Sequence, residues 1–182
     1  MKRYYITDRK AVGGFGPLLD VIRDQMRLGV DFIQIREKDI SAHELFEFTL
    51  AVIEARANDV HARSRTKILV NSRADVAQIT GADGVHLPAS APRETLPGLF
   101  VARSCHTLEE VKESKADLIA YGPVFDTPGK GPAVGLASLQ QACRLRRNVY
   151  ALGGVNWDNA AECVHVGAEG IAGIRLFQEP EL

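Results

Sequence analysis

The segment Phe100–Glu110 carries the side chains best suited to acid–base chemistry. It reads FVARSCHTLEE: an apolar stretch typical of a buried strand is followed by Thr107, three residues before Glu110, which is the pattern of a helix capping box. Ser104 and His106 are therefore expected at the carboxyl end of a strand. A histidine there can accept and donate a proton near neutral pH, although a histidine that only satisfies a loop hydrogen bond fits the same pattern.

Two other side chains compete with His106 for this role. Adjacent side chains of an extended segment point to opposite faces, so Cys105 is expected to face away from the edge that Ser104 and His106 face. His86 lies between two apolar residues, and we expect it to point into the packing or toward a loop carbonyl.

A phosphate site is predicted at Gly153–Gly154. Asn156 follows closely and is expected to open a helix, so that exposed backbone N–H groups and a helix N-terminus could bind an anion. Arg175 could add a charge-assisted contact. A simple tight turn and a solvent-exposed arginine would show the same pattern.

Arg36 and Lys38 are a second candidate for anion binding. The side chains of the segment DFIQIRE alternate, and this places Gln34, Arg36 and the following Lys38 near the end of a strand. Two cations at one strand end suit an anionic group. The alternative is that they form salt bridges with the neighbouring Glu37 or Asp39.

The sequence offers no evident metal site. Cys105, Cys143 and Cys163 show no CxxC or Cys/His ligand spacing, and we interpret them as free thiols of a reducing compartment. Carboxylates that would hold Mg²⁺ are missing at two expected strand ends, Asn71–Ser72 and Pro88–Pro92. We therefore predict neither a metal nor a cofactor.

Composition indicates an ordinary globular protein. The 182 residues suffice for one domain, spanning residues 1–182. The formal net charge of −1, without a block of Lys and Arg, argues against a general nucleic-acid binder. Because no apolar run approaches 18 residues and no signal core follows Met1, we expect a cytoplasmic protein with no membrane partner.

Strand-like and helical segments alternate along the chain. The strand-like segments are Arg3–Asp8, Asp31–Glu37, Lys67–Asn71, Val85–Leu87, Leu99–Ala102, Asp117–Gly122, Val149–Gly154 and Gly170–Phe177. The helical segments are Pro17–Gly29, Ser41–Asn58, Arg73–Thr80, one opening at Thr107, Leu136–Arg146 and Asn156–Val166.

Eight alternations predict a compact α/β fold, the TIM (β/α)₈ barrel, with the last helix short or missing. An open doubly wound sheet is the rival, but no GxGxxG turn follows the first strand. The loop Pro123–Pro132, rich in Gly and Pro, is expected to act as a substrate lid.

A resemblance to a known family rests on motifs that occur in order from Tyr4 to about Ile174. They read YYITD, DFIQIREK, ILVNSRADVA, GADGVHL, ARSCHTLEE, DLIAYGPVFDTPGK, ALGGV and GAEGIAGI. Together they resemble the thiamin phosphate synthase/TenI family. The resemblance implies a TIM barrel, a small phosphorylated thiazole ligand and a homodimer.

Within that family the sequence is similar to the TenI branch. The synthase joins a pyrimidine pyrophosphate to a thiazole phosphate, and its pattern has two Asp residues that hold Mg²⁺. Here those places read Ser72 and the acid-free segment Pro88–Pro92, so synthase activity is not expected. The RSxH segment and the HLPxS-like loop also resemble the TenI branch.

The TenI branch includes the thiazole tautomerase, a cofactor-independent isomerase that aromatises a thiazole carboxylate phosphate. The resemblance then implies His106 as the catalytic acid and base, and a phosphate on Gly153–Gly154 and on the backbone near Ile174–Arg175. Arg175 departs from the family, which usually has a small Ser there. Matching ligand-contact motifs add Gln34, Arg36, Lys38, Asn71, Ser104, Thr127 and Lys130.

Three alternatives remain open at this point. Thr127 and Lys130 could belong to a surface turn rather than to a loop that closes over a ligand. The chain could be a thiamin phosphate synthase after all. It could also be a regulatory protein that binds thiazole phosphate without turning it over.

Overall fold

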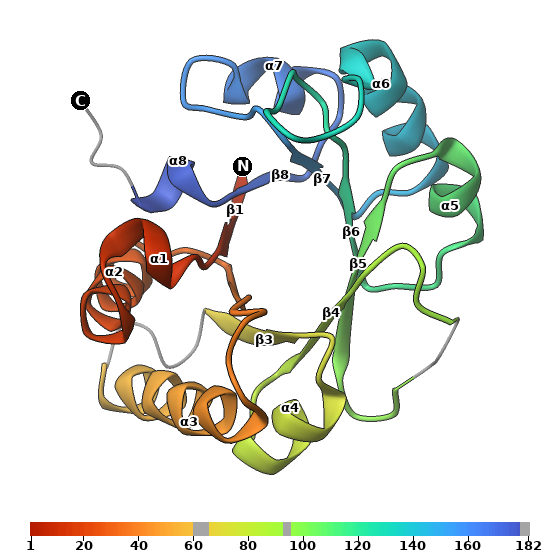
Figure 1. Ribbon diagram of the computed structural model, residues 1–182. Coiled ribbons are helices and arrows are strands. Elements are labelled where there is room, and N and C mark those ends of the chain that lie inside the picture. Colours follow the sequence, from red (N-terminus) through yellow and green to blue (C-terminus); the bar gives the residue numbers. More distant parts are fainter. Residues whose placement is uncertain (60–65, 93–95, 179–182) are drawn as a thin grey trace.

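Eight parallel strands close into a barrel (Figure 1). The computed structural model describes residues 1–59, 66–92 and 96–178. The strands are β1 (Lys2–Ile6), β2 (Phe32–Ile35), β3 (Lys67–Asn71), β4 (Gly84–Leu87), β5 (Phe100–Cys105), β6 (Leu118–Tyr121), β7 (Val149–Leu152) and β8 (Gly170–Gly173). Each strand pairs with the next and β8 pairs with β1, which confirms the barrel and excludes the open sheet.

Helices surround the barrel on its outside (Figure 1). They are α1 (Arg9–Val12), α2 (Phe15–Arg27), α3 (Ala42–Asn58), α4 (Ala74–Thr80), α5 (Leu108–Glu113), α6 (Gly135–Leu145), α7 (Ala160–His165) and α8 (Arg175–Gln178). Ser41 with Glu44, and Thr107 with Glu110, form reciprocal capping boxes at the starts of α3 and α5. The two helix starts read from the sequence are thereby confirmed to within a residue.

Side chains alternate along each strand between two separate cores. Tyr4 and Ile6 point into the barrel with the aromatic rings of Phe32 and Tyr150, whereas Tyr5 packs outward against the helices. The inner core is small and rich in aromatic rings, in the way expected of a barrel filled by its own side chains. Its aromatic floor closes the barrel below the carboxyl ends of the strands.

The last two segments differ from the sequence prediction. The expected strand Gly170–Phe177 ends at Gly173, and Arg175 begins α8, so the last helix is present but short. The helix expected from Asn156 begins only at Ala160, because the side chains of Asn156 and Asn159 accept each other's backbone N–H and form a closed turn first.

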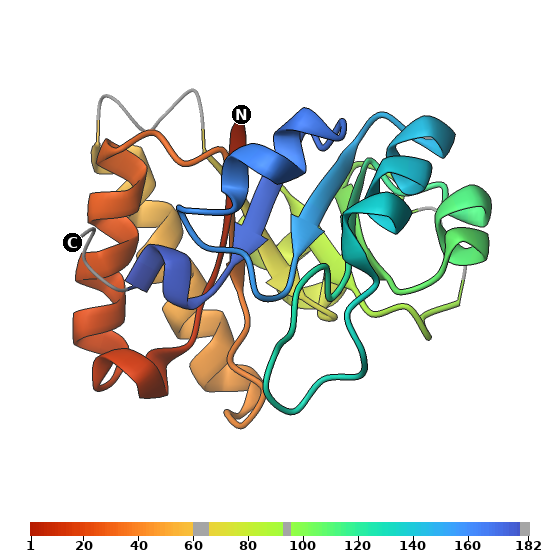
Figure 2. The same ribbon diagram turned by 90° about the horizontal axis from the view of Figure 1, so that it is seen from above.

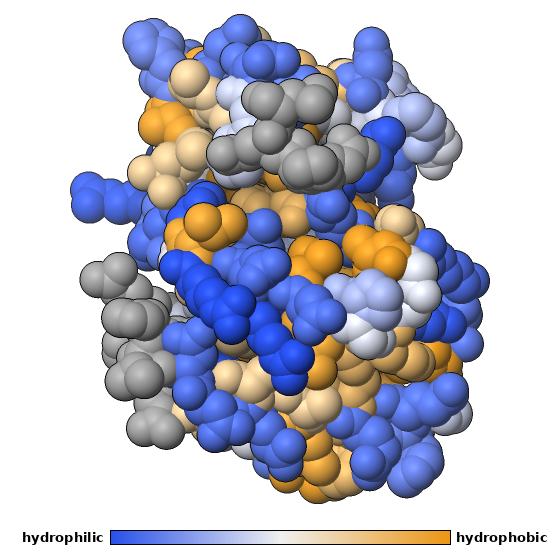
Figure 3. All heavy atoms as spheres, turned by 90° about the vertical axis from the view of Figure 1, so that its left-hand side faces the viewer, coloured by the Kyte–Doolittle hydropathy of each residue, from blue (hydrophilic) through white to orange (hydrophobic). Residues whose placement is uncertain are grey.

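The outer surface is mixed in polarity. Figure 3 faces the side that carries α1, α2 and α8, and it shows apolar atoms in separated patches among hydrophilic side chains. Among the described residues no helix has the length and apolar character needed to cross a membrane.

Candidate functional site

A pocket of about 450 Å³ opens at the carboxyl ends of the strands. Figure 2 shows the loop between β6 and α6 extending beyond these strand ends, and it contributes Thr127 and Lys130 to the pocket wall. All twelve site residues proposed from the sequence line the pocket: Gln34, Arg36, Lys38, Asn71, Ser104, His106, Thr127, Lys130, Gly153, Gly154, Ile174 and Arg175. The closed barrel explains this convergence, because parallel strands end on one face.

His106 is the first residue after β5, and its ring is fixed by a loop carbonyl. Its Nδ1 lies 2.6 Å from the backbone oxygen of Gly122, which can only accept, so Nδ1 carries the proton of the neutral ring. The lone pair is then on Nε2. The ring therefore satisfies a loop hydrogen bond, as one interpretation expected, and it also lines the pocket. Its role as an acid and base stays a prediction.

Cys105 faces away from the pocket, as the strand alternation predicted. It is fully buried between the barrel and the helices. Burial raises the pKa of its thiol to about 11, with a further contribution from the Glu110 carboxylate, so it is a poor base near neutral pH. Its position and its protonated thiol thus favour His106 over Cys105 as the proton-transfer group.

Three cations gather on one side of the pocket mouth. Arg36 and Lys38 follow β2, and Lys130 reaches in from the β6–α6 loop. The positive charge of Arg36 lowers the pKa of Lys38, and burial and Lys130 lower it further, which places the three charges near one another. Within the described part of the chain none of them forms an ion pair, so their charge is available to an anionic ligand.

The acidic neighbours of these cations have other partners. Glu37 is buried and accepts hydrogen bonds from the hydroxyl of Thr7 at 2.6 Å and from the guanidinium of Arg9 at 3.2 Å. Asp39 pairs with Arg9 at 2.6 Å and with Lys10 at 2.7 Å. The alternative interpretation, in which Arg36 and Lys38 pair with Glu37 or Asp39, is therefore wrong.

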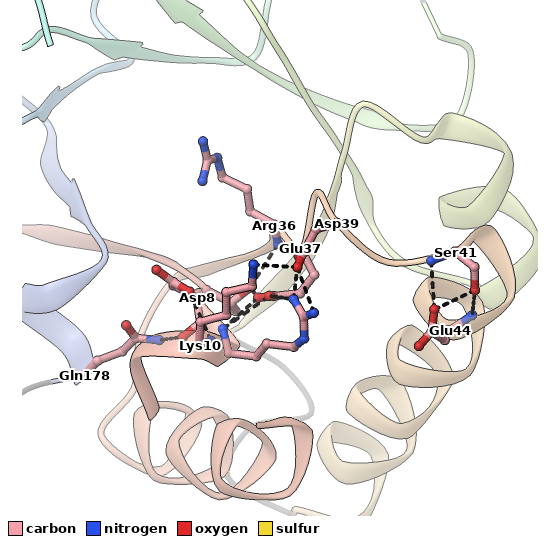
Figure 4. Close-up of polar contacts among 10 residues, drawn as sticks. Asp8, Lys10, Arg36, Glu37, Asp39, Ser41, Glu44 and Gln178 are labelled. Atoms are coloured by element: carbon pink, nitrogen blue, oxygen red, sulfur yellow. Dashed lines mark hydrogen bonds and ion pairs between the residues drawn. The ribbon is translucent and has the colours of Figure 1, made fainter. Parts of the chain in front are cut away.

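Figure 4 shows why the charges separate in this way. The side chain of Arg36 points away from the cluster around Glu37 and Asp39. The backbone N–H of Arg36 donates to the Thr7 hydroxyl, which in turn donates to Glu37, so the turn after β2 is held from below. Arg9 and Lys10 of α1 together pair with both acids, and this leaves Arg36 unpaired.

Replacing Arg9 with methionine tests this arrangement. Glu37 would keep its buried charge without a cation, and we expect the free energy of unfolding to fall by about 2–3 kcal/mol. The control is Arg23→Met, which breaks an exposed ion pair with Asp20 on α2 and should cost about 0.5 kcal/mol or less. Denaturant unfolding measures both, and equal losses would show that Arg9 has no special role.

The turn after β7 offers backbone donors to an anion. Gly153 and Gly154 have φ values of 91° and 65°, a left-handed conformation that favours glycine. The N–H groups of Gly154 and Val155 donate to no atom of the described residues. The helix N-terminus expected directly behind them is absent, since α7 starts at Ala160, so the free donors here belong to the turn.

A buried polar network under the pocket was not foreseen. His86 does not point into apolar packing or toward a loop carbonyl: its Nε2 lies 2.8 Å from Ser104 Oγ and its Nδ1 lies 2.8 Å from the hydroxyl of Tyr4. Burial, followed by the nearby charge of Arg36, lowers the pKa of His86 to about 3. His86 is therefore neutral at physiological pH and a poor candidate for proton uptake.

The residues present do not suit a protein-held Mg²⁺ ion. No Asp or Glu is among the described residues that line the pocket, and the structure shows no cluster of three potential His, Cys, Asp or Glu ligands in the ranges it describes. Ser72 lies just beyond β3 with a φ of 58°, and its N–H donates to the carbonyl of His86. Mg²⁺ prefers carboxylate oxygens, which this pocket does not provide.

A closed (β/α)₈ barrel whose mouth combines cations, free backbone donors and one positioned histidine defines the class of the protein as a TIM-type α/β barrel with a polar pocket at the carboxyl ends of its strands. The model of the family described as thiamine monophosphate synthase matches residues 3–177. The chain belongs to this thiamine monophosphate synthase family, which is enzymatic and acts in thiamin biosynthesis.

Several relatives cover nearly the whole chain. "Putative thiamine-phosphate synthase 2" of Aquifex aeolicus is 36% identical over 187 residues, covering 97% of both chains. The thiamine-phosphate synthase of Albidiferax ferrireducens is 34% identical over 185 residues, covering 94% of this chain and 82% of its own. The solved thiamine phosphate pyrophosphorylase of Pyrococcus furiosus superposes with a TM-score of 0.84 at 30% identity, covering 99% of this chain and 88% of its own.

These names bear on the two branches of the family. Each of these relatives is named for synthase chemistry, and nothing in the comparisons points to the tautomerase branch in particular. The names thus favour a transferase over the isomerase that the resemblance implied. The absence of carboxylates among the described residues that line the pocket argues against the synthase, because that enzyme needs them to hold Mg²⁺.

Proposed function

We propose that this chain is an isomerase that binds a phosphorylated thiazole and moves a proton on it with His106. The observation that carries the proposal is the geometry of the His106 ring, whose Nδ1 donates to the Gly122 carbonyl and whose Nε2 is left basic at the pocket wall. Nε2 would remove the proton from the ring carbon that bears the carboxylate. The resulting imidazolium, stabilised by the Gly122 carbonyl, would return a proton to the exocyclic carbon and leave an aromatic ring.

Two separate anion sites support a substrate with two anionic groups. The free N–H groups of Gly154 and Val155 suit a phosphate, and the three cations Arg36, Lys38 and Lys130 suit a carboxylate. A thiazole carboxylate phosphate carries both groups. Holding it at both ends would place the ring between them, beside His106.

Thiamin phosphate synthase is the second candidate, and the names of the relatives favour it. The same three cations could neutralise a departing pyrophosphate. The objection is physical: synthase chemistry uses Mg²⁺ to stabilise that developing charge, and the pocket has no carboxylate to hold the ion. The two candidates therefore differ in whether Mg²⁺ and a pyrimidine pyrophosphate are needed.

Two parallel assays separate the candidates. Purified protein is incubated with the unaromatised thiazole carboxylate phosphate, without metal, and the aromatic absorbance is followed. In the second assay it receives pyrimidine pyrophosphate, thiazole phosphate and excess Mg²⁺, and thiamin phosphate is measured. We expect turnover in the first assay alone. Turnover only in the second assay establishes the synthase, and ligand binding without turnover in either identifies a regulatory binder.

Arg175 is expected to contribute to the phosphate end of the pocket. It begins α8 beside Ile174 and is exposed, and it forms no ion pair within the described residues. Replacing it with alanine should weaken the binding of inorganic phosphate by about 10-fold, the effect of one charge-assisted hydrogen bond at an exposed position. Arg144→Ala on the outside of α6 is the control and should leave binding unchanged. Unchanged binding in Arg175→Ala would remove this arginine from the site.

A further inference from the structure

Five polar side chains form one hydrogen-bonded chain across the floor of the pocket. The consecutive contacts are Ser104 Oγ to His86 Nε2 at 2.8 Å, His86 Nδ1 to Tyr4 Oη at 2.8 Å, Tyr4 Oη to Gln34 Oε1 at 3.3 Å, and Gln34 Nε2 to Asn71 Oδ1 at 2.9 Å. The three middle side chains are at most 4% exposed. Ser104, His86, Gln34 and Asn71 all line the pocket, and the fully buried Tyr4 links His86 to Gln34 from beneath. The floor of the pocket is thus a single hydrogen-bonded network.

The hydrogen bonds of this network can be oriented in only two ways. His86 is neutral and carries a single ring proton, and Tyr4 has a single hydroxyl proton. If His86 donates from Nδ1, Tyr4 must donate onward to Gln34, and Ser104 must donate to Nε2. If His86 donates from Nε2 instead, every hydrogen bond reverses. A mixed arrangement would leave a buried donor or acceptor without a partner, which costs about 1–3 kcal/mol.

The amide of Gln34 selects between these two arrangements. Its Nε2 donates to Asn71 Oδ1, so its Oε1 faces Tyr4 and can only accept. The Tyr4 hydroxyl must therefore donate its proton to Gln34 Oε1. The oxygen of Tyr4 then accepts from His86 Nδ1, and His86 Nε2 accepts from Ser104.

We propose that this proton order makes Tyr4 and His86 positioning residues that fix what the pocket floor recognises. Ser104 donates its hydroxyl proton to His86 and therefore presents only acceptor lone pairs to the ligand, whereas Asn71 presents its amide N–H groups. The floor therefore offers a hydrogen-bond acceptor at Ser104 and hydrogen-bond donors at Asn71. This inference goes beyond the proposed proton transfer and does not depend on it.

The tautomer of His86 tests the proposal in the ligand-free protein. Long-range ¹H–¹⁵N spectra of protein labelled at histidine distinguish a protonated from an unprotonated ring nitrogen, and the signals missing in His86→Phe identify this residue among the five histidines. We expect His86 to carry its proton on Nδ1. A proton on Nε2 would reverse the chain and overturn the proposal.

The variant Tyr4→Phe tests directly whether the Tyr4 hydroxyl sets the tautomer of His86. Without the Tyr4 oxygen a proton on Nδ1 would lack an acceptor, so His86 should switch to the Nε2-protonated form and donate to Ser104. The control is Tyr5→Phe on the outer face of β1, whose hydroxyl is bonded to Gln178, and it should not change the His86 tautomer. A tautomer that stays the same in Tyr4→Phe contradicts the coupling.

The variant Asn71→Asp tests the same coupling while the buried side chains of Gln34, Tyr4 and His86 stay unchanged. An aspartate can only accept, so Gln34 must still donate toward it and the wild-type tautomer of His86 should persist. A switch to the Nε2-protonated form in this variant would show that Gln34 does not couple residue 71 to His86, and it would overturn the proposal. Because these readings need no substrate, their failure is distinct from a failure of the proposed isomerase activity.

Discussion

Replacing His106 with asparagine is expected to lower isomerase turnover by about 10²- to 10⁴-fold, the usual contribution of a general acid–base group. Asparagine can still donate to the Gly122 carbonyl, so the wall of the pocket keeps its shape while the basic nitrogen is lost. The affinity for a phosphorylated ligand should stay nearly unchanged, because the anion sites at Gly153–Gly154 and at the three cations are untouched. Turnover and binding are measured separately, by aromatic absorbance and by equilibrium titration.

Two variants serve as references for this result. Cys105→Ala removes a buried thiol that faces the helices, and it should leave turnover close to that of the wild type. His86→Asn alters the pocket floor, so its main effect should fall on KM rather than on kcat. If His106→Asn keeps the full rate while Cys105→Ala or His86→Asn abolishes it, the catalytic residue lies elsewhere on the rim.

Gly154→Ala is expected to lower the stability of the protein strongly. A Cβ there would lie 2.7 Å from Cβ of Phe125 and 2.8 Å from the carbonyl oxygen of Asp126, at a φ of +65°. Left-handed strain and overpacking together should lower the free energy of unfolding by about 2–4 kcal/mol. Phosphate binding should weaken as well, because relief of the clash moves the turn that carries the free N–H groups.

Gly129→Ala is the matched control for that variant. Gly129 also has a positive φ, of 73°, but a Cβ there would meet nothing within 4 Å. It should cost only the backbone strain of about 1–2 kcal/mol and leave phosphate binding unchanged. Similar losses in the two variants would mean that close packing of the β6–α6 loop against the Gly153–Gly154 turn contributes little.

The sequence predicted the barrel well because its signals are local and repeated. Each strand is an apolar run next to a helix start or turn, and the capping boxes at Ser41 and Thr107 fix two helix starts through contacts within four residues. Once eight such units are in order, parallel closure brings the strand ends together. The twelve site residues meet at one pocket for this reason, although they were inferred from separate segments or from the family resemblance.

Features that depend on distant contacts were missed. The partner of Glu37 is Arg9, 28 residues away, and nothing in the sequence near Arg36 points to it. His86 lies between apolar residues, and only the barrel interior brings it to Tyr4, 82 positions away. The start of α7 was misjudged because Asn156 and Asn159 cap each other before the helix begins, and Asn is also a common helix cap.

The most direct test of the proposed isomerase is the fate of one proton. The protein is incubated in D₂O with the unaromatised thiazole carboxylate phosphate, and the product is analysed by NMR for deuterium on the exocyclic carbon. The His106 side chain is exposed and exchanges with solvent, so the account predicts an aromatic product that carries a solvent deuteron there, formed at a rate that depends on His106. An absence of aromatic product, or its formation at the full rate by His106→Asn, would contradict the account.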